Sequence, residues 1–410
     1  MWADNRAVVR QPAGGGGLGD GRLAATPPAG AHLYVHVPFC DGKCLYCGFY
    51  SGMADTAQRQ VYASLPGQEW QVTAAVAGVA SWGAPRTLYF GGGTPAMLGV
   101  PGLQALVDGL RAQVSLAAVA EWTVELNPAS VTPALLQALR AWGVNRVSIG
   151  AQSLDDEVLR FLGRRHTAQA VIEAVAMARA AGFANMGLDL IAAVPGVSLA
   201  AWRATLAAAV ALELPHLSVY ALSMEAQTPL AQGVAAGHVA MPDEEAQLAA
   251  LALTEELLGA AGLVRYEISN YARPGCECQH NLACWRGEDY LGLGPSASSR
   301  AGLQRWTNQA DLTAYQHDLQ GGRPPPREAE ELDPAADAVE RFVFGVRLHE
   351  GVDPVAFACR YPAARPRLNE WLATLARLAQ QGVMARTAAG GWQLTAHGRE
   401  VADAVVAELL

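Results

Sequence analysis

Three cysteines lie close together near the start of the sequence: Cys40, Cys44 and Cys47, in the segment "FCDGKCLYC". The chain has only seven cysteines, and its N-terminal region lacks the apolar core of a secretory signal. We therefore expect a cytoplasmic protein, and in the cytoplasm clustered cysteines bind metal or do redox chemistry more often than they form disulfides. The C-x-x-x-C-x-x-C spacing predicts a metal or redox centre.

Three interpretations of this cluster remain open. The cysteines could be unrelated buried residues, or they could bind zinc with His36 as the fourth ligand. Pro38 argues against zinc, because it interrupts the strand that would place His36 and Cys40 on one side. We favour a [4Fe-4S] cluster, because cysteine thiolates hold the irons of such clusters. Three cysteines bind three of the four irons, so one iron would have no protein ligand.

An iron without a protein ligand can bind a small molecule. If that molecule is S-adenosylmethionine (AdoMet), its amino and carboxylate groups chelate the iron, and an electron from the cluster yields a 5′-deoxyadenosyl radical. Three glycines followed by Thr94, residues 91–94, stand at the end of the next predicted strand. Of these, Gly92 and Gly93 let the backbone approach a ligand closely. We expect this backbone to hold the amino group of AdoMet, and Glu125 to hold the ammonium group or the ribose hydroxyls.

Short apolar segments alternate with longer amphipathic segments along the first half of the chain. Predicted strands begin at Leu33, Arg86, Trp122, Arg146, Met186 and His216. Helical patterns such as those at 132–143 and 167–182 end at a glycine, as helices commonly do. The alternation indicates βαβ units with a parallel sheet, either as a full or partial (β/α) barrel or as an open doubly wound sheet.

Polar or glycine residues stand at the ends of four predicted strands: the 91–94 segment, Glu125 with Asn127, Gln152 and Asp189. The functional side of a parallel α/β fold lies at the carboxyl ends of its strands. Four such strand ends in succession therefore predict one shared site.

Length and charge limit the possible domain organisation and the possible partners. A chain of 410 residues suits one large barrel and a smaller appendage. The formal net charge of −9 argues against a nucleic-acid partner, and we expect no membrane span. We expect a flexible tail over residues 1–30, rich in Gly, Ala and Pro. Past a Pro-rich acidic connector, we expect a small helical or winged-helix-like C-terminal domain, with a hairpin at Gly390-Gly391 and a terminal helix.

These motifs resemble the radical AdoMet (radical SAM) superfamily. More narrowly, the chain is similar to the family of oxygen-independent coproporphyrinogen III oxidase, and within it to the heme chaperone HemW branch. The motifs that carry the resemblance include "YVHVPFCDGKCLYC", "YFGGGTPAML", "VELNPASVT" and "YEISNYARPG". The resemblance implies a TIM-like partial (β/α)6 barrel over residues 31–310, with an extension on the heme or substrate side, and an accessory domain over residues 311–410.

The resemblance also implies roles for single residues. The three cysteines match the ligands of the [4Fe-4S] cluster, and Tyr34, Gly92 and Glu125 match residues that contact the cluster-bound AdoMet. Residues that match the rest of the cavity, where the oxidase holds a second AdoMet, are Tyr46, Gly93, Thr94, Gln152, Arg164, Asp189 and Ala221. The strand-end position of Asp189 supports its assignment, whereas Arg164 lies on a helix-like stretch and rests on the resemblance alone.

Phe49 separates the two branches of the family. The oxidase has a fourth cysteine at this position, two residues after the third, and a longer N-terminal segment over its active site. The heme-chaperone branch lacks that cysteine, and its members bind heme and transfer it to an acceptor protein. The alternative is a coproporphyrinogen III oxidase-like enzyme of porphyrin biosynthesis, and either function implies an electron donor such as a flavodoxin or ferredoxin.

The expected heme site departs from the pattern of the branch. Where that pattern is His-Asn-x-x-Tyr-Trp, this sequence reads "HNLACW", with Cys284 in place of the tyrosine. His280 and Cys284 would share a helix face, and either can ligate heme iron. Ser298 stands where relatives often carry histidine, and Ala192 and Ala193 replace tyrosine and glycine. These differences predict altered ligand handling.

Cysteines also gather ahead of this segment. Cys276 and Cys278, with His280 and Cys284, are spaced closely enough for a second metal ion. We favour structural cysteines in a packed loop, because the segment fits the family without any metal.

Overall fold

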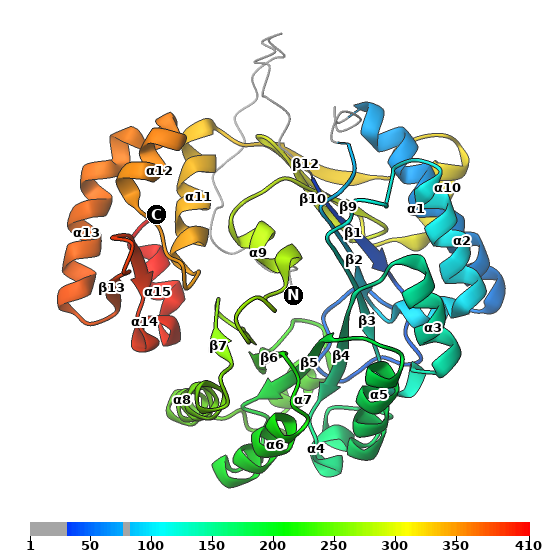
Figure 1. Ribbon diagram of the computed structural model, residues 1–410, viewed down its shortest axis with the longest axis horizontal. Coiled ribbons are helices and arrows are strands. Elements are labelled where there is room, and N and C mark those ends of the chain that lie inside the picture. Colours follow the sequence, from blue (N-terminus) through cyan, green and yellow to red (C-terminus); the bar gives the residue numbers. More distant parts are fainter. Residues whose placement is uncertain (1–30, 77–82) are drawn as a thin grey trace.

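The computed structural model describes residues 31–76 and 83–410, so the predicted tail over residues 1–30 lies outside the described residues (Figure 1). Six parallel strands neighbour one another in chain order: β1 (His32–Val37), β2 (Thr87–Gly92), β3 (Glu121–Leu126), β4 (Arg146–Gln152), β5 (Asn185–Ala192) and β6 (His216–Ala221). Each begins within one residue of its predicted start. A doubly wound sheet reverses its strand order at a switch point, and this order has no reversal. Since β1 and β6 pair with β9 and β8 rather than with each other, the predicted partial barrel is confirmed.

Helices connect the strands and cover the convex side of the sheet (Figure 1). They are α1 (Thr56–Val76), α2 (Gly99–Arg111), α3 (Pro133–Trp142), α4 (Asp156–Phe161), α5 (Ala168–Ala180) and α6 (Leu199–Ala211), with the short 3-10 helices η2 (Pro95–Leu98) and η3 (Pro128–Ser130). The local sequence explains where α3 begins and ends. The hydroxyl of Thr132 accepts from the N–H of Leu135, and Gly143 ends the helix with a φ of 107°, which glycine adopts without strain.

Side chains along the strands alternate between two faces. Aliphatic residues such as Leu33, Val124 and Ile149 belong to the main hydrophobic core with the covering helices. The alternate residues therefore point to the concave side. We call this inward set the polar lumen: His32, Tyr34, His36, Thr87, Tyr89, Glu121, Thr123, Glu125, Arg146, Ser148, Asp189, His216, Ser218 and Tyr220.

The sheet continues beyond both ends of the barrel. Next to β1 stand β9 (Tyr290–Leu293), β10 (Ser298–Ala301), β11 (Gln304–Asn308) and β12 (Arg327–Glu331), and next to β6 stand β8 (Asn270–Ala272) and β7 (Val264–Arg265). The helices of this region are α7 (Pro229–Ala235), α8 (Glu244–Ala260), α9 (Gln279–Trp285) and α10 (Leu312–Gln320). Helix α9 lies between the sheet and the C-terminal helices (Figure 1).

The C-terminal elements build a second hydrophobic core, in which the rings of Phe342 and Trp371 stack at 3.8 Å. The elements are α11 (Pro334–Val346), α12 (Pro354–Arg360), η4 (Pro362–Arg367), α13 (Leu368–Gln380), β13 (Met384–Arg386), β14 (Trp392–Leu394), α14 (Ala396–Glu400) and α15 (Ala402–Ala407). The predicted hairpin is confirmed by the pairing of β13 with β14. The predicted terminal helix is present in two parts, α14 and α15, because Val401 leaves the helical region (φ −115°, ψ 29°) between them. The domain division at residue 311 stays a prediction.

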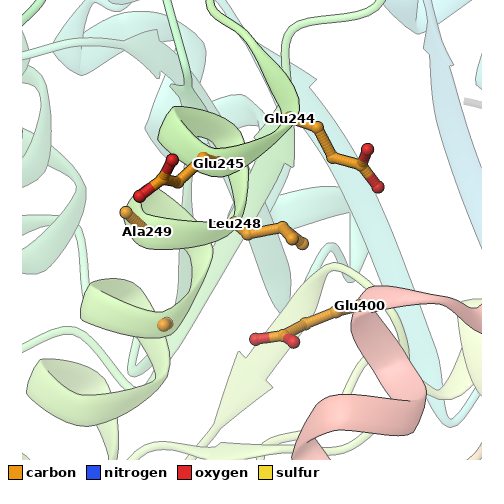
Figure 2. Close-up of a pocket in the computed structure, with 6 residues that line it drawn as sticks. Glu244, Glu245, Leu248, Ala249 and Glu400 are labelled. Carbon is orange, nitrogen blue, oxygen red and sulfur yellow. The ribbon is translucent and has the colours of Figure 1, made fainter.

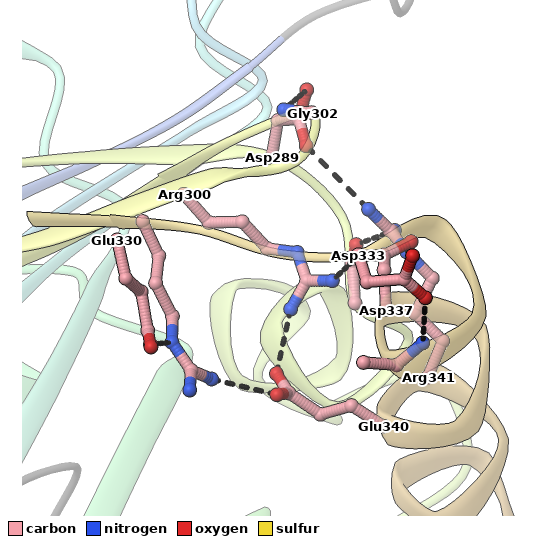
Figure 3. Close-up of polar contacts among 11 residues, drawn as sticks. Asp289, Arg300, Gly302, Glu330, Asp333, Asp337, Glu340 and Arg341 are labelled. Atoms are coloured by element: carbon pink, nitrogen blue, oxygen red, sulfur yellow. Dashed lines mark hydrogen bonds and ion pairs between the residues drawn. The ribbon is translucent and has the colours of Figure 1, made fainter. Parts of the chain in front are cut away.

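A network of arginines and carboxylates joins the sheet extension to α11 (Figure 3). Arg300 on β10 contacts Asp337 and, at 2.8 Å, Glu340. Arg341 donates to Asp337 at 2.8 Å, and Arg305 on β11 contacts Glu340 at 2.6 Å. The side chains of Arg300 and Asp337 are only 5% and 8% exposed, and each has a second partner of opposite charge, Glu340 for Arg300 and Arg341 for Asp337. The network fixes how α11 sits on the sheet.

A buried carboxylate locks α1 to the same extension. Glu69 is fully buried and accepts from the N–H of Gly294 (2.7 Å), the hydroxyl of Tyr315 (2.6 Å) and the amide of Asn308 (2.6 Å). Burial raises the pKa of Glu69 from its ordinary 4.5 to about 7. The folded state therefore binds this proton more tightly than the unfolded chain, and the stability it contributes is lost as the pH rises through about 7.

We expect Glu69→Gln to remove part of this pH dependence. Between about pH 5 and pH 8, the wild type should lose about 1–3 kcal/mol of unfolding free energy that the variant keeps. The variant keeps the length and shape of the side chain, and its Oε1 can still accept from the N–H of Gly294 and the hydroxyl of Tyr315. Urea unfolding at both pH values measures the effect, with Glu173→Gln on exposed α5 surface as the control. If the unfolding free energies of wild type and Glu69→Gln changed equally with pH, the prediction would be contradicted.

Among the described residues, none of the helices has the length and apolar character needed to cross a membrane.

Candidate functional site

The cysteine cluster lies in the loop between β1 and α1. Cys40, Cys44 and Cys47 are half-buried free thiols. The N–H of Cys47 donates to the carbonyl of Cys44 at 3.3 Å, which turns the loop tightly between the second and third cysteine. Lys43, the only lysine of the chain, donates to the carbonyl of Phe49 and closes the loop from the outside.

The thiols face residues from the carboxyl ends of the strands. Cys40 Sγ is 3.9 Å from Thr94 Oγ1, and Arg164 Nη1 is 3.6 Å from Cys44 Sγ. Burial raises the pKa of Cys47, and the neighbouring Cys44 and Cys40 thiolates raise it further. The three sulfurs therefore share one region at the mouth of the lumen.

The arrangement suits a cluster better than a single ion. Throughout residues 31–76 and 83–410, no group of three or more His, Cys, Asp or Glu side chains is placed to hold one metal ion. A cubane binds each thiolate at a different iron, so its ligands need not converge on one point. His36 does not join the cysteines as a zinc ligand, because its ring nitrogens contact the Tyr34 hydroxyl (3.1 Å) and the Tyr50 carbonyl (2.8 Å).

The glycine run after β2 packs directly against the cysteine loop. The N–H of Thr94 donates to the carbonyl of Phe39 at 2.7 Å, and a Cβ on Gly93 would lie 2.6 Å from that oxygen. Gly92 has a φ of +101°, and its N–H donates to Glu125 at 3.2 Å. Only glycine fits these positions. Because the N–H groups are used inside the protein, an ammonium group, which only donates, would be met here by carbonyl oxygens.

Two carboxylates of the lumen, Glu125 and Asp189, are held by hydroxyl groups. Glu125 accepts from the Tyr89 hydroxyl at 2.8 Å, and Asp189 accepts from Ser148 Oγ at 3.1 Å. Burial, followed by repulsion from Asp189, raises the pKa of Glu125 to about 7, and burial also raises the pKa of Asp189. Within the described ranges, neither carboxylate forms an ion pair with an arginine or lysine. Half-buried carboxylates in this state fit a cationic ligand such as AdoMet, with its sulfonium and ammonium groups.

The other predicted AdoMet residues divide between the mouth of the lumen and its edge. Gln152 ends β4 with a φ of 68°, a left-handed conformation that is uncommon outside glycine, and its amide lies near Gly150. Arg164 donates to the carbonyl of Gly150 at 2.8 Å, but it lies in the loop after α4 and not on a helix as expected. Tyr46 packs beside Arg164, and burial raises its pKa. Ala221 stands at the exposed end of β6.

Besides Cys284, three residues depart from the family pattern, and they occupy different places. Ala193 has a φ of 56°, a left-handed conformation that glycine adopts without the strain of a Cβ. Ala192 is fully buried at the end of β5. Ser298 lies on β10, where its hydroxyl is 2.8 Å from that of Thr307 on β11. Ala192 therefore belongs to the main hydrophobic core, whereas Ala193 lies just past the carboxyl end of β5.

Helix α9 places the expected heme residues at the opposite end of the barrel from the cysteines. His280 and Cys284 are both buried, and His280 Nδ1 is 2.8 Å from Thr87 Oγ1 at the start of β2. Glu121, at the start of β3, accepts from the N–H of His280 at 3.0 Å. Burial lowers the pKa of His280 to about 3 and raises that of Cys284. Cys278 points to Glu121 (3.5 Å), so the second cysteine group does not gather around one ion.

A depression of about 500 Å³ lies away from these residues, between α8 and α14 (Figure 2). Its lining is Glu244, Glu245, Leu248, Ala249, Ala252 and Glu400. None of the residues predicted to bind cluster, AdoMet or heme borders it, so it is not part of the candidate site.

Comparison with known proteins identifies the family. Residues 34–209 match the family model of the radical SAM superfamily. The chain is 36% identical to the heme chaperone HemW of Mycobacterium tuberculosis, over 95% of this chain and 97% of that one. It is 34% identical to the heme chaperone HemW of Escherichia coli, over 90% and 94% of the two chains. The solved structure of coproporphyrinogen III oxidase (HemN) from Escherichia coli, described as a radical SAM enzyme, superposes with a TM-score of 0.80 at 25% identity, covering 94% of this chain and 91% of that one. The resemblance expected from the motifs is confirmed: this chain belongs to the radical SAM superfamily and, within it, to the family of the heme chaperone HemW.

Proposed function

We propose that this protein is a cytoplasmic heme chaperone that binds a [4Fe-4S] cluster, AdoMet and heme and passes the heme to an acceptor protein. The observation that carries the proposal is the similarity to proteins named heme chaperone HemW along nearly the whole chain. Phe49, in place of the fourth cysteine expected in the oxidase, supports the same choice.

The chain's own residues divide the work at the carboxyl ends of the strands. The three cysteines would hold the cluster, and the cluster, when bound, supplies one-electron reduction to its ligand. Glu125 would attract the cationic end of AdoMet, since its carboxylate has no other cation to neutralise it. Arg164 would hold the cysteine loop on the strand ends through Cys44 and Gly150. The electron for the cluster would come from a donor such as a flavodoxin or ferredoxin.

His280 is the better of the two candidate heme ligands. Its imidazole is neutral, as metal ligation requires, whereas burial raises the pKa of the Cys284 thiol and disfavours the ligating thiolate. The rings of Tyr89 and Tyr34 lie 5.2 Å and 6.4 Å from that of His280, so aromatic surfaces suited to a flat macrocycle stand next to it.

The similarity to HemN over most of both chains favours a second candidate, a coproporphyrinogen III oxidase-like enzyme. The carboxylates and strand-end residues of the lumen would serve AdoMet in either function. The two differ in what happens to the tetrapyrrole, which an oxidase decarboxylates and a chaperone releases unchanged.

An anaerobic hemin titration tests the chaperone. We expect a saturable, stoichiometric shift of the Soret band, weakened about tenfold or more by His280→Gln because an iron ligand is lost. His238→Gln, at an exposed position after α7, is the matched control and should leave the titration unchanged. Absence of saturable binding would contradict the chaperone. Formation of 5′-deoxyadenosine and a vinyl product from coproporphyrinogen III would establish the oxidase instead.

A further inference from the structure

A chain of hydrogen bonds runs from the protein surface to His280 in the lumen. Glu288 Oε2 is 3.1 Å from His32 Nε2, and His32 Nδ1 is 2.8 Å from Thr87 Oγ1. The same Thr87 oxygen is 2.8 Å from His280 Nδ1. Glu288 is 30% exposed, whereas the side chains of His32, Thr87 and His280 are at most 4% exposed.

The number of hydrogens that these groups can donate gives the series of hydrogen bonds a direction. The Thr87 hydroxyl carries one hydrogen and contacts two ring nitrogens, so it donates to one ring and accepts from the other. The Glu288 carboxylate, with the Arg86 guanidinium 3.5 Å away, only accepts, and it therefore takes the N–H of His32 Nε2. With its one ring hydrogen on Nε2, His32 accepts the Thr87 hydrogen at Nδ1. The Thr87 oxygen accepts in turn from the Nδ1–H of His280, which leaves the lone pair of His280 on Nε2.

The backbone around His280 fixes where that lone pair stands. Glu121 accepts from the N–H groups of Gln279 and His280, each at 3.0 Å, so the first turn of α9 is tied to β3. The His280 ring is also held beside Tyr89, at 5.2 Å between ring centroids. Since Nδ1 is engaged with Thr87, the Nε2 edge is the one available to a ligand.

We propose that Glu288, His32 and Thr87 form a positioning relay that holds His280 as its Nδ1–H tautomer and presents Nε2 as a ligand to heme iron. This inference rests on the proposed heme-binding function. Histidines that bind metal commonly donate their other ring N–H to a carboxylate or carbonyl, which fixes the tautomer and raises the basicity of the ligating nitrogen. Here a hydroxyl and a second imidazole stand between His280 and the carboxylate. None of the three relay residues would touch the heme.

The tautomer can be read without heme, by nitrogen NMR of the full chain carrying isotope-labelled histidine. His280, assigned by the signal lost in His280→Gln, should show a protonated Nδ1 and an unprotonated Nε2. Thr87→Val keeps the shape of the side chain and removes the hydroxyl, so the Nδ1–H signature should be lost. Thr87→Ser restores the hydroxyl and should restore the signature. An Nε2–H tautomer in the wild type, or an unchanged His280 in Thr87→Val, would overturn the relay.

Hemin titration separates the relay from the proposed function. If the relay serves ligation, Thr87→Val should weaken hemin binding about tenfold, and Thr87→Ser should bind as the wild type does. Equal hemin affinity in wild type and Thr87→Val would overturn a role in ligation. A wild type that shows the Nδ1–H signature but no hemin binding would end the proposed function and leave the relay standing. Unchanged thermal unfolding of Thr87→Val would exclude a general loss of structure as the cause.

Discussion

Replacement of Cys40, Cys44 or Cys47 by alanine is expected to abolish the [4Fe-4S] cluster. Each thiolate would hold a different iron, so two remaining ligands cannot retain the cubane. After anaerobic reconstitution, the broad visible absorption should disappear in every variant, and bound iron and sulfide should fall to background. The fold should survive, because none of the three cysteines belongs to the main hydrophobic core.

Cys359→Ala is the control for these variants. Cys359 is exposed on α12, among the C-terminal elements, and its loss should leave the cluster spectrum intact. Circular dichroism of all four variants should match that of the wild type. A cluster spectrum unchanged by Cys44→Ala would refute the ligand assignment.

AdoMet binding to the reconstituted protein is expected to weaken about 10-fold to 100-fold in Glu125→Gln, since a carboxylate facing a cation is lost. The same group predicts a pH dependence. Burial raises the pKa of Glu125 to about 7, so below neutrality the carboxyl is protonated and cannot attract a cation. The affinity of the wild type should therefore rise between about pH 6 and about pH 8, and the variant should lose this rise.

Isothermal calorimetry under anaerobic conditions measures both effects, and Glu173→Gln on α5 serves as the matched control. A wild-type affinity that stays flat across this range would show that Glu125 does not meet the cationic end of AdoMet. Equal affinities of wild type and Glu125→Gln would lead to the same conclusion.

The sequence pattern was sufficient to predict the parallel βαβ sheet and the grouping of residues at its carboxyl edge, whereas the choice of a partial barrel came from the resemblance. Strands are bounded by local signals, such as the run of alternating side chains in β1 and the glycine that ends α3, so their starts could be placed within one residue. The carboxyl ends of parallel strands meet at one edge of a sheet, which let Glu125, Gln152 and Asp189 be grouped without coordinates.

The part of the polar lumen near the strand starts was not predicted, although the sequence carries a signal for it. Segments such as His32-Leu33-Tyr34-Val35-His36 alternate polar and apolar residues, a period that predicts polar side chains on the face opposite the core. The sheet extension could not be found in this way. Strands as short as Val264–Arg265 carry no periodicity. The pairing of β9 with β1 joins residues far apart in the chain, such as Tyr290 and His32. The position of Arg164 was mistaken although its signal is local: Gly163, directly before it, follows the end of α4 with a φ of +74°.

The single lysine of the cysteine loop has a practical consequence. A protease that cleaves only after lysine has one target bond in the whole sequence, between Lys43 and Cys44, and Lys43 is exposed. Cleavage into two fragments would thus report the accessibility of this loop alone. The rate of cutting, followed on a gel as iron and sulfide are supplied, would give a direct footprint of cluster assembly.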